Sequence, residues 1–250
     1  MVRFDFEQTF GDDYLHFYLP GMTDEVNDHQ TAIVRERLDV APGARVLDAP
    51  CGHGRVANRL ARAGHDVIGV DITPAFLAKA KHDAAAMGVA VDYRDGDLRA
   101  LPVEDASVDA VVNWFTSWGY WEDDDNALVL REYERVLRPG GRVLIEIIAR
   151  DNIIRRYTGA PDAIVDDRGD HLSFSTSWFE PMTGRLETDR TIVRDGAIRR
   201  EHHSVRLLTI QEWQVWLGEA GFTDVRATDW AGQPVTMDTT RLVVVATRRT

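Results

Sequence analysis

The 250-residue sequence predicts an α/β fold: a doubly wound, Rossmann-like sheet of seven strands with an inserted antiparallel β cap. Short apolar runs alternate with stretches of helical periodicity from Ala44 to Ile148, as is typical of parallel strands joined by right-handed crossovers. Residues 151–206 break this rhythm, because polar and apolar residues alternate there around turn sequences. Two strand-like runs near the C-terminus complete a mostly parallel sheet with a terminal antiparallel strand.

Each element of the alternating region has its own boundary signals. Gly64 ends the first predicted helix, and Thr73 followed by Pro74 begins the second as an N-cap and a proline at the first helical position. Thr209 and Glu212 form the capping-box pattern that opens the last helix. The predicted strands span 44–49, 65–70, 89–95, 107–115, 141–148, 222–230 and 241–249, and the predicted helices span 55–63, 74–87, 123–137 and 210–220.

The remaining residues surround this predicted core, which spans 41–150 and 207–250. Residues 1–40 form an N-terminal helical lid segment, in which an irregular aromatic stretch precedes an amphipathic helix. Residues 151–206 form the inserted cap, which we expect to cover the sheet and to take part in binding a substrate. The predicted helix of the lid spans 24–38, and the predicted strands of the cap span 171–179, 185–193 and 198–208.

Composition narrows the classes of function. Hydrophobic residues make up 44% and charged residues 28%, close to globular averages, and no apolar run approaches the roughly 20 residues of a membrane span. A single cysteine, the absence of an apolar signal-peptide core and a net charge of −12 predict a cytoplasmic protein that binds neither membranes nor nucleic acid. The exposed sheet of the cap could pair between two copies, so a homodimer stays open.

Polar residues gather at the carboxyl ends of four predicted strands, where a doubly wound sheet binds its ligands. After the first strand, Gly52 and Gly54 allow a ligand to approach the backbone closely, at a helix N-terminus that can hold an anion. Asp71 ends the second strand, and its carboxylate can accept both hydroxyls of a ribose. Asp97 follows the third strand and can accept from an adenine amino group, and residues 113–120 add aromatic and hydroxyl side chains after the fourth.

A nicotinamide cofactor is the competing interpretation of the glycine loop. Its fingerprint, G-x-G-x-x-G, needs a third glycine three positions after Gly54, where this sequence has Ala57. The stronger evidence is the set of acids at three consecutive strand ends, to which Asp48 contributes from the first. A nicotinamide oxidoreductase is therefore the least favoured enzyme class.

These motifs resemble those of class I S-adenosylmethionine-dependent methyltransferases. The segments VLDAPCGHG, GVDI and GDL look like the family's cofactor motifs, and RVLRPGGRVLIE looks like its helix-to-fifth-strand signature. The resemblance covers about 44–149 and the terminal hairpin. The segments FTSWGYWEDDDNALVLREYERVLRPGG and SVRLLTIQEW are similar to a broad bacterial subgroup that acts mostly on small molecules. The resemblance implies S-adenosylmethionine as the cofactor, S-adenosylhomocysteine as its product and a small-molecule acceptor.

The resemblance also implies roles for single residues. Asp48 would meet the amino group of the methionine moiety, Asp71 would take the ribose hydroxyls, and Asp97 would face the adenine amine. Cys51 would contribute its backbone and not act as a nucleophile, because no paired base lies at a suitable spacing. The expected cofactor-binding residues are Asp48, Ala49, Cys51, Gly52, Gly54, Asp71, Ile72, Asp97, Leu98, Asn113 and Trp114.

Acceptor-binding residues are expected from the lid segment, from the run after the fourth strand and from the cap, although ordinary packing is the alternative for each. His202 and His16 are the candidate general bases, against a structural or solvated role. No metal site is expected, because His202 and His203 are neighbours on a strand and point apart. The expected acceptor-binding residues are Tyr14, Tyr18, Ser117, Trp118, Tyr120 and Trp178.

The sequence thus predicts transfer of a methyl group from S-adenosylmethionine to an oxygen or nitrogen of a small molecule. In-line positioning of the acceptor would supply most of the catalysis, with a histidine base as an addition. Two alternatives stay open: methylation of RNA or protein, and a cofactor-binding module without catalysis. The net charge of −12 disfavours RNA, and a closed cavity without room for an acceptor would favour the module.

Overall fold

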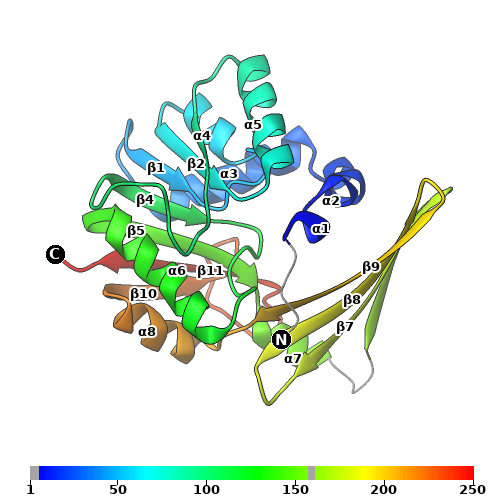
Figure 1. Ribbon diagram of the computed structural model, residues 1–250. Coiled ribbons are helices and arrows are strands. Elements are labelled where there is room, and N and C mark those ends of the chain that lie inside the picture. Colours follow the sequence, from blue (N-terminus) through cyan, green and yellow to red (C-terminus); the bar gives the residue numbers. More distant parts are fainter. Residues whose placement is uncertain (1–5, 157–160) are drawn as a thin grey trace.

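A seven-stranded sheet forms the centre of the computed structural model, which describes residues 6–156 and 161–250 (Figure 1). The strands lie in the order β10-β11-β5-β4-β1-β2-β3, and β11 alone runs against its neighbours. This order confirms the predicted doubly wound, mostly parallel sheet. The strands are β1 (Arg45–Asp48), β2 (Asp66–Asp71), β3 (Asp92–Asp95), β4 (Val108–Asn113), β5 (Leu137–Ile148), β10 (Phe222–Thr228) and β11 (Arg241–Arg248).

Helices cover both faces of this sheet. One face carries α3 (Asp24–Leu38), α4 (Ala57–Arg62) and α5 (Pro74–Met87), and the other carries α6 (Asp123–Val136) and α8 (Ile210–Glu219). The predicted capping box of Thr209 and Glu212 forms, but the predicted cap at Thr73 makes no side-chain hydrogen bond to its helix. The Thr23 hydroxyl accepts from the backbone N–H of Val26 and caps α3.

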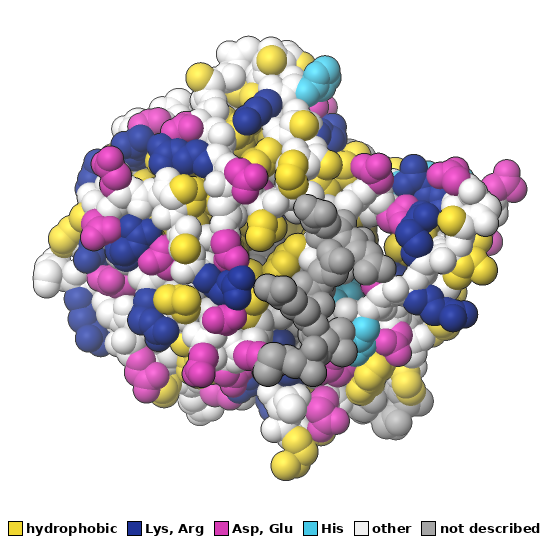
Figure 2. Space-filling view, viewed as in Figure 1, with side chains coloured by type: hydrophobic (Ala, Val, Ile, Leu, Met, Phe, Trp, Pro, Cys, Tyr) yellow, Lys and Arg dark blue, Asp and Glu magenta, His cyan; other side chains and the backbone are white. Residues whose placement is uncertain are grey.

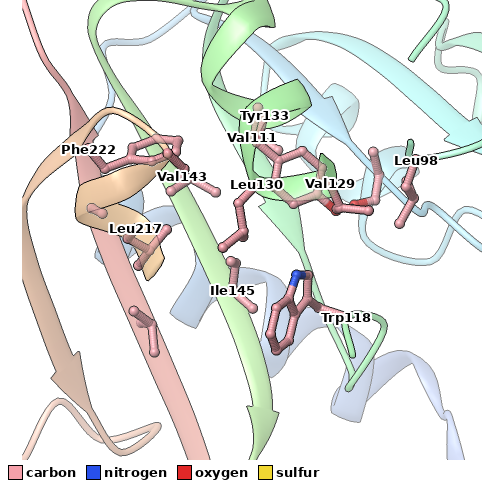
Figure 3. Packing of buried hydrophobic residues seen from close by; sticks show 14 of the residues in the cluster. Leu98, Val111, Trp118, Val129, Leu130, Tyr133, Val143, Ile145, Leu217 and Phe222 are labelled. Carbon is pink, nitrogen blue, oxygen red and sulfur yellow. The ribbon is translucent and has the colours of Figure 1, made fainter. Parts of the chain in front are cut away.

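The core consists of two apolar layers, one on each side of the sheet. In β1, the side chain of Val46 packs among α3, α4 and α5, whereas Leu47 packs on the opposite face with α6 and α8. Figure 3 shows this second layer, where Trp118 and Leu130 lie beside residues of β5 and α8. The alternation of Val46 and Leu47 is the two-residue period of a strand that is buried on both faces.

Two strands of the central sheet begin three or four residues from their predicted starts, and the other five begin within one residue of them. Strand β5 begins at Leu137 and not at 141, because Leu137 adopts an extended conformation directly after α6. Strand β3 begins at Asp92 and not at 89, because Val89 belongs to the end of α5. There Gly88 adopts a positive φ of 66°, and the N–H of Val89 donates to the carbonyl oxygen of Ala84.

The cap is a separate antiparallel sheet that extends away from the core (Figure 1). It contains the three predicted strands and a fourth, at its edge, that the sequence analysis did not identify. A short helix, α7 (Arg150–Arg156), leads towards it. The strands are β6 (Asp162–Arg168), β7 (His171–Glu180), β8 (Arg185–Arg194) and β9 (Ala197–Arg206), in that order.

The lid segment lies between the core and the cap (Figure 1). It forms two short helices, α1 (Phe6–Thr9) and α2 (Asp12–Tyr18), and a 3₁₀ turn, η1 (Leu19–Gly21), ahead of α3. Asp13 joins α2 to the cap through ion pairs with Arg194 and Arg199. Across the described ranges, no helix has both the length and the apolar character that a membrane crossing requires.

Candidate active site

One cavity lies at the carboxyl ends of β1 to β4, beneath the lid helices α1 and α2. The space between its lining atoms is about 880 Å³ when its open mouth is included. Most of the expected site residues line it. From the cofactor set these are Asp48, Cys51, Gly52, Asp71, Ile72, Asp97, Leu98 and Trp114, and from the acceptor set they are Tyr14, Ser117 and Tyr120.

Asp48 and Asp71 are both buried in the wall of this cavity. Burial raises the pKa of Asp48 to about 7, and its Oδ2 atom has no hydrogen-bond partner among the described residues. Asp71 accepts from the backbone N–H groups of Gly52, at 2.8 Å, and Thr73, at 2.9 Å. Asp71 therefore shapes the glycine loop, while Asp48 keeps an acceptor free for a donor on a ligand.

The carboxylate of Asp97 is already held by Arg99. Its Oδ2 atom accepts from Nη2 of Arg99 at 2.7 Å, and its Oδ1 atom accepts from the backbone N–H of Arg99 at 2.8 Å. Burial alone would raise the pKa of Asp97, but these hydrogen bonds outweigh it and lower the pKa. Asp97 is thus an ionised acceptor at the cavity wall, and a ligand amine would share it with Arg99.

Three residues of the expected cofactor set lie behind the cavity wall and do not line it. The side-chain amide of Asn113 is buried and donates to Tyr133 at 2.7 Å and to the carbonyl oxygen of Ala49. Gly54 packs against α5, where a β-carbon would lie 2.3 Å from the hydroxyl of Tyr93. Ala49, Gly54 and Asn113 thus lie behind the loop, where Gly54 allows close packing and Asn113 forms hydrogen bonds.

Three residues of the expected acceptor set also lie elsewhere. Trp118 is fully buried in the core, where its ring centroid lies 4.6 Å from that of Trp213. Tyr18 stacks on Tyr14 at 4.4 Å and accepts from Arg190 of the cap, so it supports the wall from behind. Trp178 lies beside His202 on the cap and does not line the cavity.

Neither candidate base reaches the cavity. Arg190 contacts the lid from one face of the cap sheet, and the strand register places His202 on the other face. The His202 ring is paired there with Glu187 and Asp189. His16 lies on α2, and its Nε2 atom is 3.0 Å from Nδ1 of His171 in the cap. These placements do not support a role for His202 or His16 as a base, and both instead join parts of the fold.

The cavity is also lined by residues outside the expected cofactor-binding and acceptor-binding sets. Among the described residues, His53 is the only histidine in the lining, and burial lowers its pKa to about 4. Arg55 lines the same region and is mostly buried. The sequence contains one indication of this site, because the amides Asn27 and Gln30 lie one turn apart on a predicted amphipathic helix. The sequence alone does not identify Arg55 as the residue that they bind. The other unassigned residues are Phe6, Phe10, Pro50, Val56, Thr73, Phe76, Gly96, Phe115 and Trp121.

Aromatic rings form the cavity wall that the lid and the residues after β4 provide. The centroid of Phe10 lies 5.4 Å from that of Tyr14 and 5.5 Å from that of Tyr120, and Phe6 lies 5.1 Å from Trp121. Burial raises the pKa of both Tyr14 and Tyr120, so the two phenols are neutral at physiological pH. This wall can exclude water and hold an apolar or aromatic part of a ligand.

The loop after β4 is fixed by a buried carboxylate. Phe115 and Thr116 both adopt positive φ, at 72° and 55°. Glu146 is fully buried, accepts from the backbone N–H of Phe115 at 2.8 Å and forms an ion pair with Arg241. Its backbone carbonyl also accepts from the N–H of Thr116. The hydrogen bonds to Glu146 therefore offset the free-energy cost of the positive φ of Phe115 and keep this residue in the cavity wall.

Comparisons with known proteins agree with this geometry. Residues 46–141 match a family described as "Methyltransferase domain". The chain is 38% identical over 131 residues to a probable S-adenosylmethionine-dependent methyltransferase of Mycolicibacterium smegmatis, covering 51% of this chain and 48% of that protein. It is 37% identical over 110 residues to a demethylmenaquinone methyltransferase of Thermus thermophilus, covering 43% of this chain and 48% of that protein.

A solved structure extends the likeness over nearly the whole chain. The CcbJ methyltransferase of Streptomyces caelestis superposes with a TM-score of 0.80 at 21% identity, covering 97% of this chain and 98% of that one. At this identity the superposition establishes a shared fold, cap included. The sequence matches cover only part of each protein, since the chain spans about half the length of the curated relatives it matches.

Proposed function

We propose that the chain is a class I S-adenosylmethionine-dependent methyltransferase, as its match to a methyltransferase domain supports, and that it transfers the methyl group of S-adenosylmethionine to an oxygen or nitrogen of a small molecule. The observation that carries the proposal is the alignment of three carboxylates along one cavity. Asp48, Asp71 and Asp97 follow three adjacent parallel strands and all line the same space. They are acceptors for a ligand that presents an amino group, a ribose and an adenine.

The buried polar atoms of the cavity suit this cofactor. The unpartnered Oδ2 atom of Asp48 would accept from the amino group of the methionine moiety. Asp71 would accept from the ribose hydroxyls with the lone pairs that Gly52 and Thr73 leave free, and Asp97 would accept from the adenine amine. When bound, S-adenosylmethionine supplies a methyl group already activated by the adjacent sulfonium.

The chain's own contribution would be positioning. The aromatic wall, with Tyr14 and Tyr120 in it, would hold the acceptor and exclude water. Such alignment can supply roughly 7–11 kcal/mol of a barrier. His53 is neutral at pH 7, because its pKa is about 4, so it could receive a hydrogen bond from the acceptor but would be a weak base. We therefore propose catalysis without the help of His202 or His16.

Two features support a small molecule over RNA. Among the relatives, the demethylmenaquinone methyltransferase is named for a small acceptor. Basic and acidic side chains also intermingle over the face of the molecule shown in Figure 2, without a continuous basic surface. A phosphate backbone would need such a surface, and the net charge of −12 adds to the repulsion.

The experiment is a methyl-transfer assay with labelled S-adenosylmethionine. The acceptors would be a panel of small hydroxylated compounds and amines, with bulk RNA and protein in parallel and Asp71→Ala as the inactive control. We expect label in at least one small molecule. Label in RNA or protein alone would contradict the proposal. Tight cofactor binding with no transfer to any acceptor would favour the module without catalysis.

A further inference from the structure

Arg55 is a buried cation in the wall of the cavity. It follows Gly54 in the glycine loop, and only 9% of the residue is exposed. Its Nη1 atom donates to Oε1 of Gln30 at 2.5 Å and to Oδ1 of Asn27 at 3.1 Å. Its Nη2 atom is buried and has no hydrogen-bond partner among the described residues. One end of the guanidinium is therefore fixed by neutral amides, and the other end is available.

No carboxylate of the described residues forms an ion pair with Arg55, although Asp48 and Glu146 lie near enough to favour its charged form. The ring of Phe115 lies 4.9 Å from its guanidinium carbon. Burial lowers the pKa of Arg55, as expected for a cation without an anionic partner. Burying an uncompensated charge is costly, and part of that cost is recovered when an anion binds.

Helix α3 fixes the orientation of this guanidinium. The Nδ2 atom of Asn27 donates to the carbonyl oxygen of Met22 at 2.8 Å, which turns the Oδ1 atom of Asn27 toward Arg55. The Oε1 atom of Gln30 accepts from Nε1 of Trp114 at 2.9 Å as well as from Arg55. The lid segment thus contributes two buried amides that hold Nη1 of Arg55, while Nη2 has no partner among the described residues.

The same cavity contains an unpartnered buried acceptor, Oδ2 of Asp48. Asp48 and Arg55 affect each other's charge, yet they do not form an ion pair with one another. A cation and an anion held apart in one cavity are complementary to a zwitterion. The amino group and the carboxylate of a free α-amino acid have this arrangement of charges.

We propose that Arg55 binds the carboxylate of the methionine moiety of S-adenosylmethionine and is a specificity-determining residue for the cofactor. This inference rests on the proposed function. The carboxylate is assigned to the cofactor because the amino-group acceptor Asp48 and the loop residue Gly52 line the cavity beside Arg55. The alternative ligand group for Arg55 is a carboxylate on the methyl acceptor, and the experiment distinguishes it from the carboxylate of the cofactor.

The experiment is a double-mutant cycle of binding, measured by calorimetry without turnover. One change is Arg55→Gln in the protein. The other replaces the ligand's carboxylate, by comparing S-adenosylhomocysteine with its carboxamide. We expect the wild type to bind S-adenosylhomocysteine about tenfold to a hundredfold more tightly than the carboxamide. Arg55→Gln should lose this preference, binding the two ligands equally, and Arg55→Lys should retain part of it.

The control is Arg62→Gln. Arg62 lies on α4, close to Arg55 in sequence, but its half-exposed side chain pairs with Asp28 and does not line the cavity. Arg62→Gln should retain the wild-type preference for the carboxylate. Thermal unfolding of the ligand-free proteins gives a second readout. A melting temperature of Arg55→Gln close to that of Arg62→Gln would show that a lost preference for the carboxylate does not come from unfolding of the variant.

Three results would overturn the inference. Equal affinity of the wild type for S-adenosylhomocysteine and its carboxamide would show that the carboxylate is not recognised. A preference that persists in Arg55→Gln would assign the carboxylate to the backbone of the glycine loop. Unchanged cofactor binding in Arg55→Gln with weaker binding of a carboxylate-bearing acceptor would assign Arg55 to the acceptor. If the wild type binds neither ligand, the proposed function fails as well, which is a distinct outcome.

Discussion

Asp71 links the shape of the glycine loop to the recognition of a nucleoside. Its two oxygens accept from the N–H groups of Gly52 and Thr73 and hold the ends of two loops together. The hydroxyl of Thr73, predicted to cap α5, bonds to Asp71 instead. A single carboxylate at a strand end thus organises the cavity before any ligand arrives.

Replacing Asp71 by alanine should weaken binding of S-adenosylhomocysteine by about tenfold to a hundredfold, because hydrogen bonds to a charged acceptor are lost. Calorimetric titration measures this change. The matched control is Asp95→Ala, since Asp95 ends the neighbouring strand β3 but does not line the cavity. An Asp71→Ala protein that binds as tightly as the wild type would refute the role of Asp71.

Asp48 should make cofactor binding depend on pH. In the free protein its pKa is about 7, because burial disfavours the ionised form. The amino group of the ligand needs the carboxylate, so binding below pH 7 must release a proton from Asp48. Affinity for S-adenosylhomocysteine should therefore rise up to about tenfold per pH unit towards pH 7 and level off above it.

This prediction is checked by titrations at pH 5.5, 6.5, 7.5 and 8.5. Asp48→Asn cannot ionise, and its affinity should be lower and nearly constant over the same range. Equal affinity of the wild type at pH 5.5 and 8.5 would show that Asp48 does not pair with the ligand.

At the scale of elements, β5 and β11 together hold the loop after β4. Glu146 on β5 is bonded to Arg241 of β11 and to the indole N–H of Trp230, and it accepts from the backbone of Phe115. Glu146→Gln should lower the free energy of unfolding by about 3 kcal/mol, because it leaves Arg241 without its anionic partner. Denaturant unfolding measures this quantity.

The comparison variant is Glu134→Gln. Glu134 pairs with Arg248 farther along β11, where both side chains are partly exposed, so the loss should be about 1 kcal/mol or less. Similar losses of unfolding free energy in the two variants would show that the buried ion pair stabilises the fold no more than the partly exposed pair does.

The lid is joined to the cap by Asp13, and this contact should slow the release of ligand. Asp13 accepts from Arg194 at 3.0 Å and from Arg199 at 2.8 Å, while Tyr14, the next residue, lines the cavity. Asp13→Asn should accelerate dissociation of S-adenosylhomocysteine about fivefold, from a loss of roughly 1 kcal/mol.

Stopped-flow tryptophan fluorescence can follow this release, because Trp114 and Trp121 line the cavity. Asp12→Asn changes an exposed carboxylate in the same turn of α2 and should leave the rate unchanged. An unchanged rate in Asp13→Asn would mean that α2 does not restrain the ligand.

At the scale of the whole molecule, the sequence predicted the sheet and its ligand edge well. Asp48 and Asp71 end their strands and Asp97 follows the end of β3, and all three line the cavity, because a buried parallel strand places its carboxyl end at the ligand edge. This inference needs only local periodicity and chain order.

Residues that depend on tertiary contacts were less predictable. His202 was assigned to the site, but the register of β8 and β9 places it on the face of the cap away from the lid. Trp118 is aromatic and close to β4 in sequence, yet its ring packs in the core. No local pattern predicts Arg55 as a site residue, because its burial depends on α3, which is distant in sequence.

The most direct test of the account is a calorimetric titration of the whole chain with S-adenosylmethionine and S-adenosylhomocysteine, with NAD as the control. The account predicts micromolar binding of the first two ligands, weakened by about tenfold to a hundredfold in Asp71→Ala, and no binding of NAD. Absence of binding by either sulfur ligand, or tighter binding of NAD, would contradict the assignment of the cavity.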